Sequence, residues 1–301
     1  MEQNYWVYQD CFIFKPDFNG PIIDYLDIIK QYNKLIFSNY NDLESSIKKI
    51  NGEKFYSEKY NGSKFNVQLG NSLDKSINLT HLTFCEAFNQ PLSSSLDQLV
   101  NLTHLTFDLY FNQPLENSLY KLINLTHLTF DSDFNQPLSN SLIQLINLTH
   151  LTFGECFDQH LSNSLDHLIN LTHITFSWMF NQPLSSTLFY LTKLEHLSLS
   201  YEFNQELNLP SNIKILTLNY NNQNFIDNLP NSIEQLNFGC HFVLQLDNLP
   251  SSIKKISLYN SYYDNPLNNL PKSLEQLELP KRYKLEIKNI PPNCKIIYLS
   301  E

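Results

Sequence analysis

Apolar and polar residues alternate in short segments that recur along most of the chain. The segment at 79–84 reads Leu-Thr-His-Leu-Thr-Phe, so that Leu82 and Phe84 alternate with His81 and Thr83. A period of two predicts a β-strand with its apolar side chains on one face and its polar side chains on the other. A single strand cannot bury such a face, so the pattern predicts several strands stacked around a common core.

The strand pattern returns every 23 residues. Leu-Thr-His-Leu-Thr-Phe stands at 79–84, 102–107, 125–130 and 148–153, with variants at 171–176 and 194–199. A second motif, Phe-Asn-Gln-Pro-Leu, keeps the same interval at 88–92, 111–115, 134–138 and 180–184, with variants at 157–161 and 203–207 and a degenerate copy at 65–69. Leu92, Leu96 and Leu99 supply the apolar stripe of a short return segment. Units of this length and leucine spacing fall in the range of leucine-rich repeats.

The interval shortens after residue 207. Strand-like segments recur at 213–218, 233–238, 253–258, 274–279 and 294–299, each after a Leu-Pro or Ile-Pro pair. Upstream, Tyr32–Phe37 resembles an outlying strand copy, and Ser45–Ile50 echoes the copy at Ser251–Ile256. We interpret both upstream segments as degenerate repeats.

These periods predict an α/β-type repeat solenoid of the leucine-rich-repeat kind. A parallel β-sheet is expected on one side and short helices, 3-10 turns or extended segments on the other, with mostly strand and coil toward the C-terminal end. We expect one continuous solenoid with four parts: an aromatic-rich N-terminal cap at 1–31, degenerate repeats at 32–78, regular 23-residue repeats at 79–207, and shorter Leu-Pro repeats at 208–301.

The combination of Phe-Asn-Gln-Pro-Leu, a Ser-Leu-x-x-Leu segment and Leu-Thr-His-Leu-Thr-Phe resembles the FNIP repeat, a relative of the leucine-rich repeat. The resemblance is specific across 65–207 and looser across 208–301. FNIP repeats occur in proteins of cellular slime moulds and giant DNA viruses, so the resemblance points to such a source, a viral one included. It implies a non-enzymatic protein-interaction module, and no catalytic residue carries over.

Some proteins of this family begin with an F-box that docks onto a ubiquitin ligase. In this chain Pro21–Leu26 is similar to one F-box helix, whereas the rest of residues 1–31 departs from that pattern. The aromatic residues of this segment are better interpreted as a cap on the apolar edge of the first strand, because a solenoid needs one. They are Tyr5, Trp6, Tyr8, Phe12 and Phe14.

Composition narrows the class of partner. The chain has 20 Lys and Arg against 30 Asp and Glu, a net charge of −10, which argues against a nucleic-acid partner. Residues 79–207 hold 2 basic and 12 acidic residues, which would attract a partner with a basic patch. A role of this charge in solubility alone is equally compatible.

Targeting signals favour a cytoplasmic protein, in the host cell if it is viral, that is neither secreted nor bound to a membrane. The N-terminus has no basic segment or long apolar run, and no stretch reaches the ~18 apolar residues of a membrane helix. Five cysteines without metal-type spacing indicate free thiols. The sequons at Asn78, Asn101, Asn124, Asn147 and Asn170 are interpreted as copies of one ancestral Asn-Leu-Thr, and their glycosylation stays open.

Three columns of repeated polar residues are expected along the solenoid. The asparagines of the second motif should form a hydrogen-bonded ladder along the turns. The position before each strand histidine is threonine in the regular repeats and then alternates in charge, which predicts an ion ladder. That alternation runs through Glu195, Lys214, Glu234, Lys254, Glu275 and Lys295.

The strand histidines form a third column on the polar face. A metal strip is one interpretation, but a tetrahedral site needs converging ligands and a ladder offers only a line, so we expect no metal and no cofactor. Stacked imidazolium ions would repel one another, so stability should fall as the pH drops from 7 to 5.5. The histidines are His81, His104, His127, His150, His173 and His196.

The residues just past each strand differ between copies, and this rim holds the candidate partner-binding side chains. Acids and large aromatics in variable loop positions are typical of binding anchors, although neutral drift gives the same pattern. The candidates are Glu86, Asp108, Tyr110, Asp131, Asp133, Glu155, Trp178 and Tyr201, together with the six histidines of the column.

The sequence therefore predicts a non-enzymatic scaffold or adaptor that binds another protein through its repeat face. The chain has no histidine before residue 79 and lacks the hydrolase, protease and nucleotide-binding motifs, which argues against an enzyme. The alternatives are a substrate receptor of a ubiquitin ligase and a structural protein that self-associates through the edge of its C-terminal strand.

Overall fold

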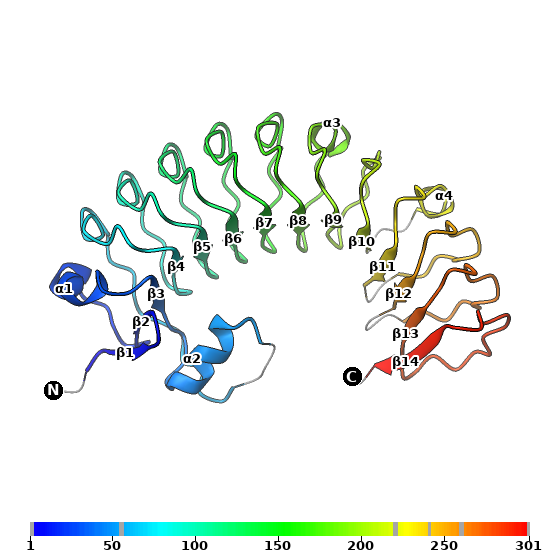
Figure 1. The fold of residues 1–301 in the computed structure, drawn as a ribbon, viewed down its shortest axis with the longest axis horizontal. Helices are drawn as coiled ribbons and strands as arrows, with labels where there is room; N and C mark the ends of the chain where they lie inside the picture. Colours follow the sequence, from blue (N-terminus) through cyan, green and yellow to red (C-terminus); the bar gives the residue numbers. More distant parts are fainter. Residues whose placement is uncertain (1–2, 54–56, 219–221, 240–241, 259–261, 300–301) are drawn as a thin grey trace. The chain divides into compact units, whose positions relative to one another are not determined.

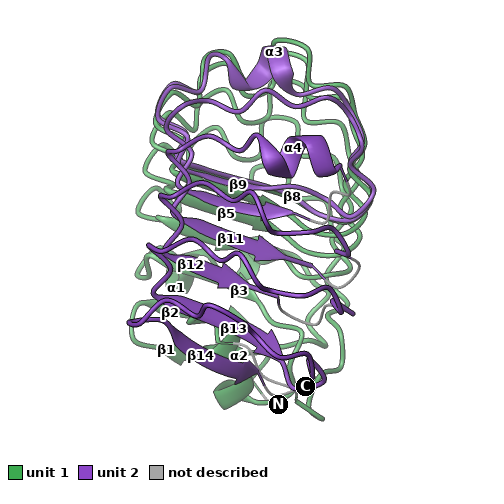
Figure 2. Cartoon of the chain, turned by 90° about the vertical axis from the view of Figure 1, so that its right-hand side faces the viewer, with its two compact units in different colours: residues 1–168 green, residues 169–301 purple. Residues whose placement is uncertain are grey.

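Parallel strands stacked in sequence order make up both parts of the chain (Figure 1). This computed structural model describes residues 3–53, 57–218, 222–239, 242–258 and 262–299. The chain divides into two compact units, Met1–Leu168 and Ile169–Glu301, which Figure 2 distinguishes by colour. We call them unit 1 and unit 2 and describe each by itself. Each is a parallel-strand β-solenoid, which confirms the predicted fold class.

Unit 1 begins with an antiparallel hairpin and continues as a parallel sheet. Strand β1 (Tyr5–Tyr8) pairs with β2 (Cys11–Phe14) in the hairpin. Parallel strands follow in sequence order: β3 (Lys34–Phe37), β4 (His81–Thr83), β5 (His104–Phe107), β6 (His127–Phe130) and β7 (His150–Phe153). Lys34 lies opposite His81, so the predicted outlying strand copy at 32–37 is confirmed.

The core of unit 1 is filled by the apolar positions of the strands and of the return segments. Leu82 and Phe84 are fully buried, whereas His81 and Thr83 lie half-buried on the opposite face, as the alternation predicts. Phe84 stacks on Phe88 of the second motif with ring centroids 4.1 Å apart. The same pairing recurs in the next turns, so two rows of phenylalanine rings run through the core.

The return segments of unit 1 are strings of hydrogen-bonded turns. The backbone N–H of Ser95 donates to the carbonyl of Leu92 at 2.9 Å, and that of Leu99 donates to Leu96 at 3.0 Å. These turns bury the leucines of the return stripe without a regular helix. The 3-10 turn η1 (Ile22–Tyr25) and the helix α1 (Leu26–Ile29) form the corresponding segment between β2 and β3, so the motif at Pro21–Leu26 belongs to a return segment.

The prediction of a repeat copy at Ser45–Ile50 is wrong, because these residues belong to helix α2 (Leu43–Ile50). Asp42 caps the helix, and its Oδ1 accepts the backbone N–H of Ser45 at 2.8 Å. Leu43 and Ile50 pack against side chains of β2 and β3 that point away from the return segments. Helix α2 therefore lies on the face of the sheet opposite the return segments, which we call the outer face (Figure 1). A capped helix with an apolar face satisfies its own backbone, so it has no need of a strand ladder.

Asparagines of the second motif join consecutive turns, which confirms the predicted ladder. The Oδ1 of Asn89 accepts the backbone N–H of Asn112 at 3.0 Å and the Nε2 of Gln113 at 2.9 Å. Asn112 and Asn66 act in the same way toward their following turns. The glutamine of the motif therefore belongs to the ladder as well, a role not predicted from the sequence.

The sequon asparagines form a second ladder. The Nδ2 of Asn101 donates to the carbonyl of Ile77 at 2.9 Å, and Asn124 and Asn147 donate to the previous turn at the same distance. This inter-turn bond is a structural reason for the repeated Asn-Leu-Thr.

Unit 2 has the same kind of parallel strand arrangement, with shorter turns after β9. Its strands are β8 (His173–Phe176), β9 (His196–Ser198), β10 (Ile215–Leu218), β11 (Gln235–Phe238), β12 (Lys255–Ser257), β13 (Gln276–Pro280) and β14 (Lys295–Leu299), paired in parallel from β8 onward. Its return segments include helices α3 (Ser185–Leu188) and α4 (Gln223–Asp227). Helix α4 departs from the mostly strand and coil structure expected toward the C-terminal end. Asn222 caps this helix by accepting the N–H of Phe225 at 3.1 Å.

The alternating charges of unit 2 pair across neighbouring turns. Lys214 Nζ lies 2.6 Å from Glu195, and Lys254 Nζ lies 2.7 Å from Glu234. These two pairs confirm the ion ladder where they occur, and both are about half exposed.

No helix in the described part of the chain has the length and apolarity needed to cross a membrane. Among the described cysteines, Cys11, Cys85, Cys156 and Cys294 are free thiols, and Cys240 lies outside the described residues. Burial raises the pKa of the Cys85 thiol.

Candidate functional site

The outer face of the sheet in unit 1 carries rows of polar side chains. Strand register places His81 opposite His104, and His104 opposite His127, so the histidines form one row across β4–β7. The threonines two residues later, such as Thr106 and Thr129, form a parallel row. Both rows are half-buried, so the histidines are less exposed than a solvent-facing column would be.

The histidine rings of unit 1 stack closely. The ring centroids of His81 and His104 lie 4.1 Å apart with an interplanar angle of 8°, and the next two pairs repeat this spacing. Each ring also contacts the threonine before it, and the Nδ1 of His104 lies 2.9 Å from the Oγ1 of Thr103. That hydroxyl donates to the carbonyl of Thr80, one turn earlier, at 2.9 Å.

Burial and the charges of neighbouring groups lower the pKa values of these imidazoles. Burial, reinforced by the neighbouring His81, lowers the pKa of His104 to about 4. Burial together with His104 lowers the pKa of His127 to about 4. Burial and then Lys34 lower the pKa of His81. The acid-sensitive range thus extends to lower pH than the interval from 7 to 5.5 that the sequence suggests.

Helix α2 borders a pocket of about 310 Å³ on this face. Two predicted histidines, His81 and His104, and the predicted rim residue Asp108 line it together with side chains from β3 and α2. The Nδ2 of Asn39 donates to the Oδ2 of Asp108 at 2.6 Å. The remaining lining includes Lys34, Tyr40, Ser46, Lys49, Thr83 and Thr106.

Two acidic side chains have raised pKa values: Asp108, which lines this pocket, and Glu86, whose backbone N–H contacts Asn39 of the lining. Burial, followed by the charge of Asp131, raises the pKa of Asp108, while Lys49 and the Asn39 hydrogen bond act in the opposite direction. Burial and then Asp108 raise the pKa of Glu86, whose carboxylate also accepts a hydrogen bond from the Tyr60 hydroxyl. A cationic group from outside would therefore stabilise this rim.

Other predicted rim residues of unit 1 lie along the same edge. Tyr110 is 52% exposed, and its backbone N–H donates to the carbonyl of Glu86. The same inter-turn hydrogen bond recurs in later turns, where the backbone N–H of Asp133 donates to the carbonyl of Leu109 and that of Cys156 donates to the carbonyl of Ser132. Asp131 is half-buried and Glu155 is exposed.

The residue before Glu155, Gly154, lies too close to the previous turn for any side chain. A Cβ on Gly154 would come within 2.2 Å of the backbone of Asp131, so only glycine permits this close approach of the two turns.

The predicted residues of unit 2 form a separate group. The rings of Trp178 and Tyr201 pack with centroids 4.9 Å apart, and Trp178 is 48% exposed. His173 and His196 lie 3.8 Å apart but tilt by 44°, so the parallel stacking of unit 1 does not extend to this pair.

The contribution of residues 38–51 to the pocket was not predicted from the sequence. Asn39 and Lys49 reach it because α2 folds over the outer face. The signal was present as an N-cap aspartate, Asp42, followed by the apolar spacing of Leu43, Ile47 and Ile50. Similarity to a strand copy concealed it.

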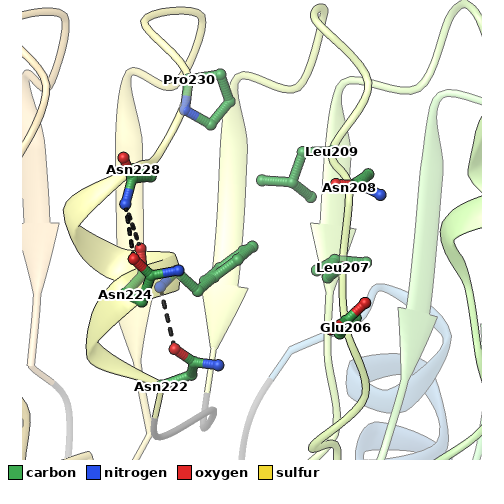
Figure 3. Close-up of a pocket in the computed structure, with 9 residues that line it drawn as sticks. Glu206, Leu207, Asn208, Leu209, Asn222, Asn224, Asn228 and Pro230 are labelled. Atoms are coloured by element: carbon green, nitrogen blue, oxygen red, sulfur yellow. Dashed lines mark hydrogen bonds between the residues drawn. The ribbon is translucent and has the colours of Figure 1, made fainter.

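Unit 2 has a second pocket, of about 440 Å³, between Glu206–Leu209 and the segment that contains α4 (Figure 3). Asn222, Asn224 and Asn228 line one side, and the Nδ2 of Asn228 donates to the carbonyl of Asn224 at 2.7 Å. These amides stabilise the helix and its cap, and none of the predicted partner-binding residues lies in this pocket.

Within the described ranges, no group of three or more histidine, cysteine or acidic side chains is arranged to hold a metal ion. The parallel rings of unit 1 direct their nitrogens side by side and do not converge on one point.

Comparison with known proteins identifies the repeat. Two segments, 203–241 and 244–282, match the FNIP Repeat family. Both lie in unit 2, where the motifs resemble the FNIP repeat more loosely, and each spans two strands. A search of curated proteins finds no match.

Solved structures with a similar fold are leucine-rich-repeat proteins. An internalin (InlF) of Listeria monocytogenes is 16% identical, with a TM-score of 0.61 over 97% of this chain and 87% of that one. Toll in the Toll–Spatzle complex of Drosophila is 16% identical, with a TM-score of 0.58 over 98% and 36%. TLR13 in a complex with ssRNA13 is 15% identical, with a TM-score of 0.57 over 95% and 46%. The chain thus spans less than half of the last two proteins.

Proposed function

We propose that this chain, a repeat protein with FNIP repeats and a leucine-rich-repeat-like fold, is a non-enzymatic scaffold or adaptor that binds another protein through the outer face of unit 1. Folds of this kind generally mediate protein–protein interaction. The observation that carries the proposal is the pocket beside α2, where three predicted partner-binding residues, His81, His104 and Asp108, come together.

A binding role suits the chemistry of this face better than catalysis. A threonine next to a histidine resembles a nucleophile and its base, but the hydroxyl of Thr103 donates to a backbone carbonyl. It is therefore not poised to lose its proton to His104.

The acidic surface supports a protein partner with a basic patch over a nucleic acid. Residues 79–168 contain nine acidic residues and one lysine, a charge that repels phosphates. We also propose a cytoplasmic location, which fits a structural role for the Asn-Leu-Thr copies. A shift in electrophoretic mobility after glycosidase treatment of the native protein would contradict that location.

Affinity capture with a face-specific variant tests the proposal. Thr106→Arg with Thr129→Arg places two long side chains on the outer face, and Tyr120→Arg with Ile123→Arg changes exposed residues on the return side of the same unit. We expect the outer-face variant to lose partners that wild type and the return-side variant retain.

Equal recovery from all three proteins would contradict binding through this face. Recovery of a ubiquitin-ligase adaptor that requires residues 3–31, or a dimer seen by light scattering, would favour the two alternatives raised by the sequence.

A further inference from the structure

The threonines that directly precede the strand histidines of unit 1 determine which imidazole nitrogen carries the hydrogen. A hydroxyl has one proton, and a carbonyl oxygen accepts but cannot donate. Thr103 donates its proton to the carbonyl of Thr80 at 2.9 Å, and Thr126 donates to the carbonyl of Thr103 at 3.0 Å. Toward the neighbouring histidine each Oγ1 is therefore an acceptor, and the Nδ1 atoms of His104 and His127, both at 2.9 Å, must donate.

The other nitrogen of each ring is consequently a lone-pair acceptor. A neutral imidazole carries one N–H, so the Nε2 atoms of His104 and His127 have none. Thr80 donates to the carbonyl of Asn33 and lies 2.9 Å from the Nδ1 of His81, which extends the same assignment to that ring. Within the described residues, no hydrogen bond reaches the Nε2 atom of His81, His104 or His127.

The spacing of these acceptors suits a row of donors. Centroids 4.1 Å apart and interplanar angles of 8° and 10° keep the ring planes nearly parallel across β4, β5 and β6. The same Nδ1–Oγ1 contact at 2.9 Å orients each ring within its plane, so the lone pairs point in similar directions. Parallel lone pairs address separate donor atoms on a partner. The outer face of β2 and β3 differs, because its apolar side chains already hold the apolar side of α2.

The surrounding charge selects the kind of donor. Asp108 and Asp131 directly follow β5 and β6, and Asp133 lies two residues further, whereas Lys34 and Lys49 line the pocket next to His104. The acids at the ends of β5 and β6 favour a cationic donor over a neutral amide. The guanidinium group has five N–H donors in a plane and no acceptor, so it matches acceptors that cannot donate, and it stacks on flat rings.

We infer that the outer face of β5 and β6 binds arginine side chains of a partner protein, with the Nε2 atoms of His104 and His127 as the acceptors. This inference rests on the proposed function and specifies the chemistry of its partner.

The tautomer is measured directly on the wild-type protein at neutral pH by long-range ¹H–¹⁵N correlation of the histidine rings. We expect His104 and His127 in the Nδ1–H form. His160 is the internal control, because its Nδ1 accepts the backbone N–H of Ser162 at 3.1 Å and it should be in the Nε2–H form. An Nε2–H form at His104 and His127 would overturn the inference.

Binding is measured with a fluorescent oligo-arginine peptide, and an oligo-glutamate peptide serves as the probe of opposite charge. His104→Phe with His127→Phe keeps flat rings in the stack and removes both acceptors, and we expect it to weaken oligo-arginine binding by about tenfold or more. His160→Phe with His167→Phe changes two exposed histidines and should leave the affinity unchanged.

Each outcome separates this inference from the proposed function. Equal affinity of the wild type and the His104/His127 variant for oligo-arginine would overturn the inference and leave the outer face as a binding surface held by its acids. No binding of oligo-arginine to the wild type would also overturn it, whereas capture that depends on Thr106 and Thr129 would still support the proposed function. Loss of affinity confined to the His104/His127 variant supports the inference.

Discussion

The regular turns at 79–168 and the shorter turns at 208–299 are joined to their neighbours by different interactions. In the regular region, consecutive turns are joined by neutral hydrogen bonds, such as that from the N–H of Asn112 to the Oδ1 of Asn89, and by stacked phenylalanines. In the shorter turns, neighbouring strands carry opposite charges, as in the pair of Lys254 and Glu234.

The difference shows what the longer turn provides. Its extra residues hold the Phe-Asn-Gln-Pro-Leu segment, whose side chains reach the next turn from a fixed backbone position. The shorter turn replaces much of this network with Leu-Pro turns and exposed ion pairs, which contribute less to stability. We therefore expect the two regions to respond differently to mutation, acid and salt.

The largest difference should come from the aromatic rows. Phe130 is fully buried and stacks with rings of two neighbouring turns, so Phe130→Ala should destabilise unit 1 by about 3–5 kcal/mol. Phe238 has one ring partner among the described residues, Phe242, and Phe238→Ala should cost less. Urea unfolding followed by hydrogen exchange measures both, and an equal or larger loss for Phe238→Ala would contradict the comparison.

The asparagine ladder should rank next. Asn112→Ala removes the acceptor of the Asn135 N–H and of the Gln136 amide, and should cost about 1–3 kcal/mol of unfolding free energy. Asn112→Asp keeps an acceptor oxygen, so it serves as the matched control and should cost less. If alanine and aspartate have equal effects in urea unfolding, the acceptor does not carry the stability.

Acid should weaken the regular turns before the shorter ones. The folded pKa of His104 and His127 lies at about 4 against an ordinary 6.5, so the unfolded chain binds protons that the folded chain does not. Stability from these rings is present above pH 6.5 and is lost as the pH falls toward 4. In unit 2, burial also lowers the pKa of His196, which lies before the shorter turns. Hydrogen bonds to lysines lower the pKa of Glu195 and Glu234 from 4.5, and the contribution of these two carboxylates is lost only below that value.

Two tryptophans allow the units to be followed separately. Trp6→Phe leaves Trp178 as a reporter of unit 2, and Trp178→Phe leaves Trp6 as a reporter of unit 1. Thermal unfolding at pH 7 and pH 5 should show an earlier loss at Trp6. Because the raised pKa values of Glu86 and Asp108 act in the opposite direction, the histidine contribution is the difference from a His104→Phe/His127→Phe protein. An unchanged pH response in that protein would contradict the assignment.

The smallest effect should come from the exposed ion pairs of the shorter turns. Glu234→Lys places like charges beside Lys214 and Lys254, and Lys254→Glu should partly restore the stability lost. Added salt should weaken this coupling, because the pair is exposed. Strict additivity of the two substitutions at low salt would show that the pair does not couple.

Repetition made most of the fold predictable. Strand positions, buried faces and register follow from the period-two alternation and the 23-residue step, and the pairing of His81 with His104 agrees with them. The Asn ladder was predictable for the same reason, because one residue copied at every turn must satisfy the same backbone groups.

The same short sequence takes different secondary structure in two parts of the chain, because its surroundings differ. Ser-Ser-Ile-Lys-Lys-Ile forms helix at 45–50, after the capping Asp42, and contributes to β12 at 251–256, after Leu249-Pro250. The pocket beside α2 could not be predicted, because it depends on which face of the sheet that helix covers. The depressed pKa values could not be predicted either, since they arise from burial and from the charges of neighbouring histidines in the folded chain.

The asparagine ladder also bears on how such a gene changes length. Each rung accepts from the copy that follows and donates to the copy that precedes, so a whole unit inserted between two others finds both partners in place. Recombination between identical repeats can therefore lengthen or shorten the array and leave every ladder amide with a hydrogen-bond partner. Loss of part of a repeat would instead shift all later residues out of register with the ladder positions.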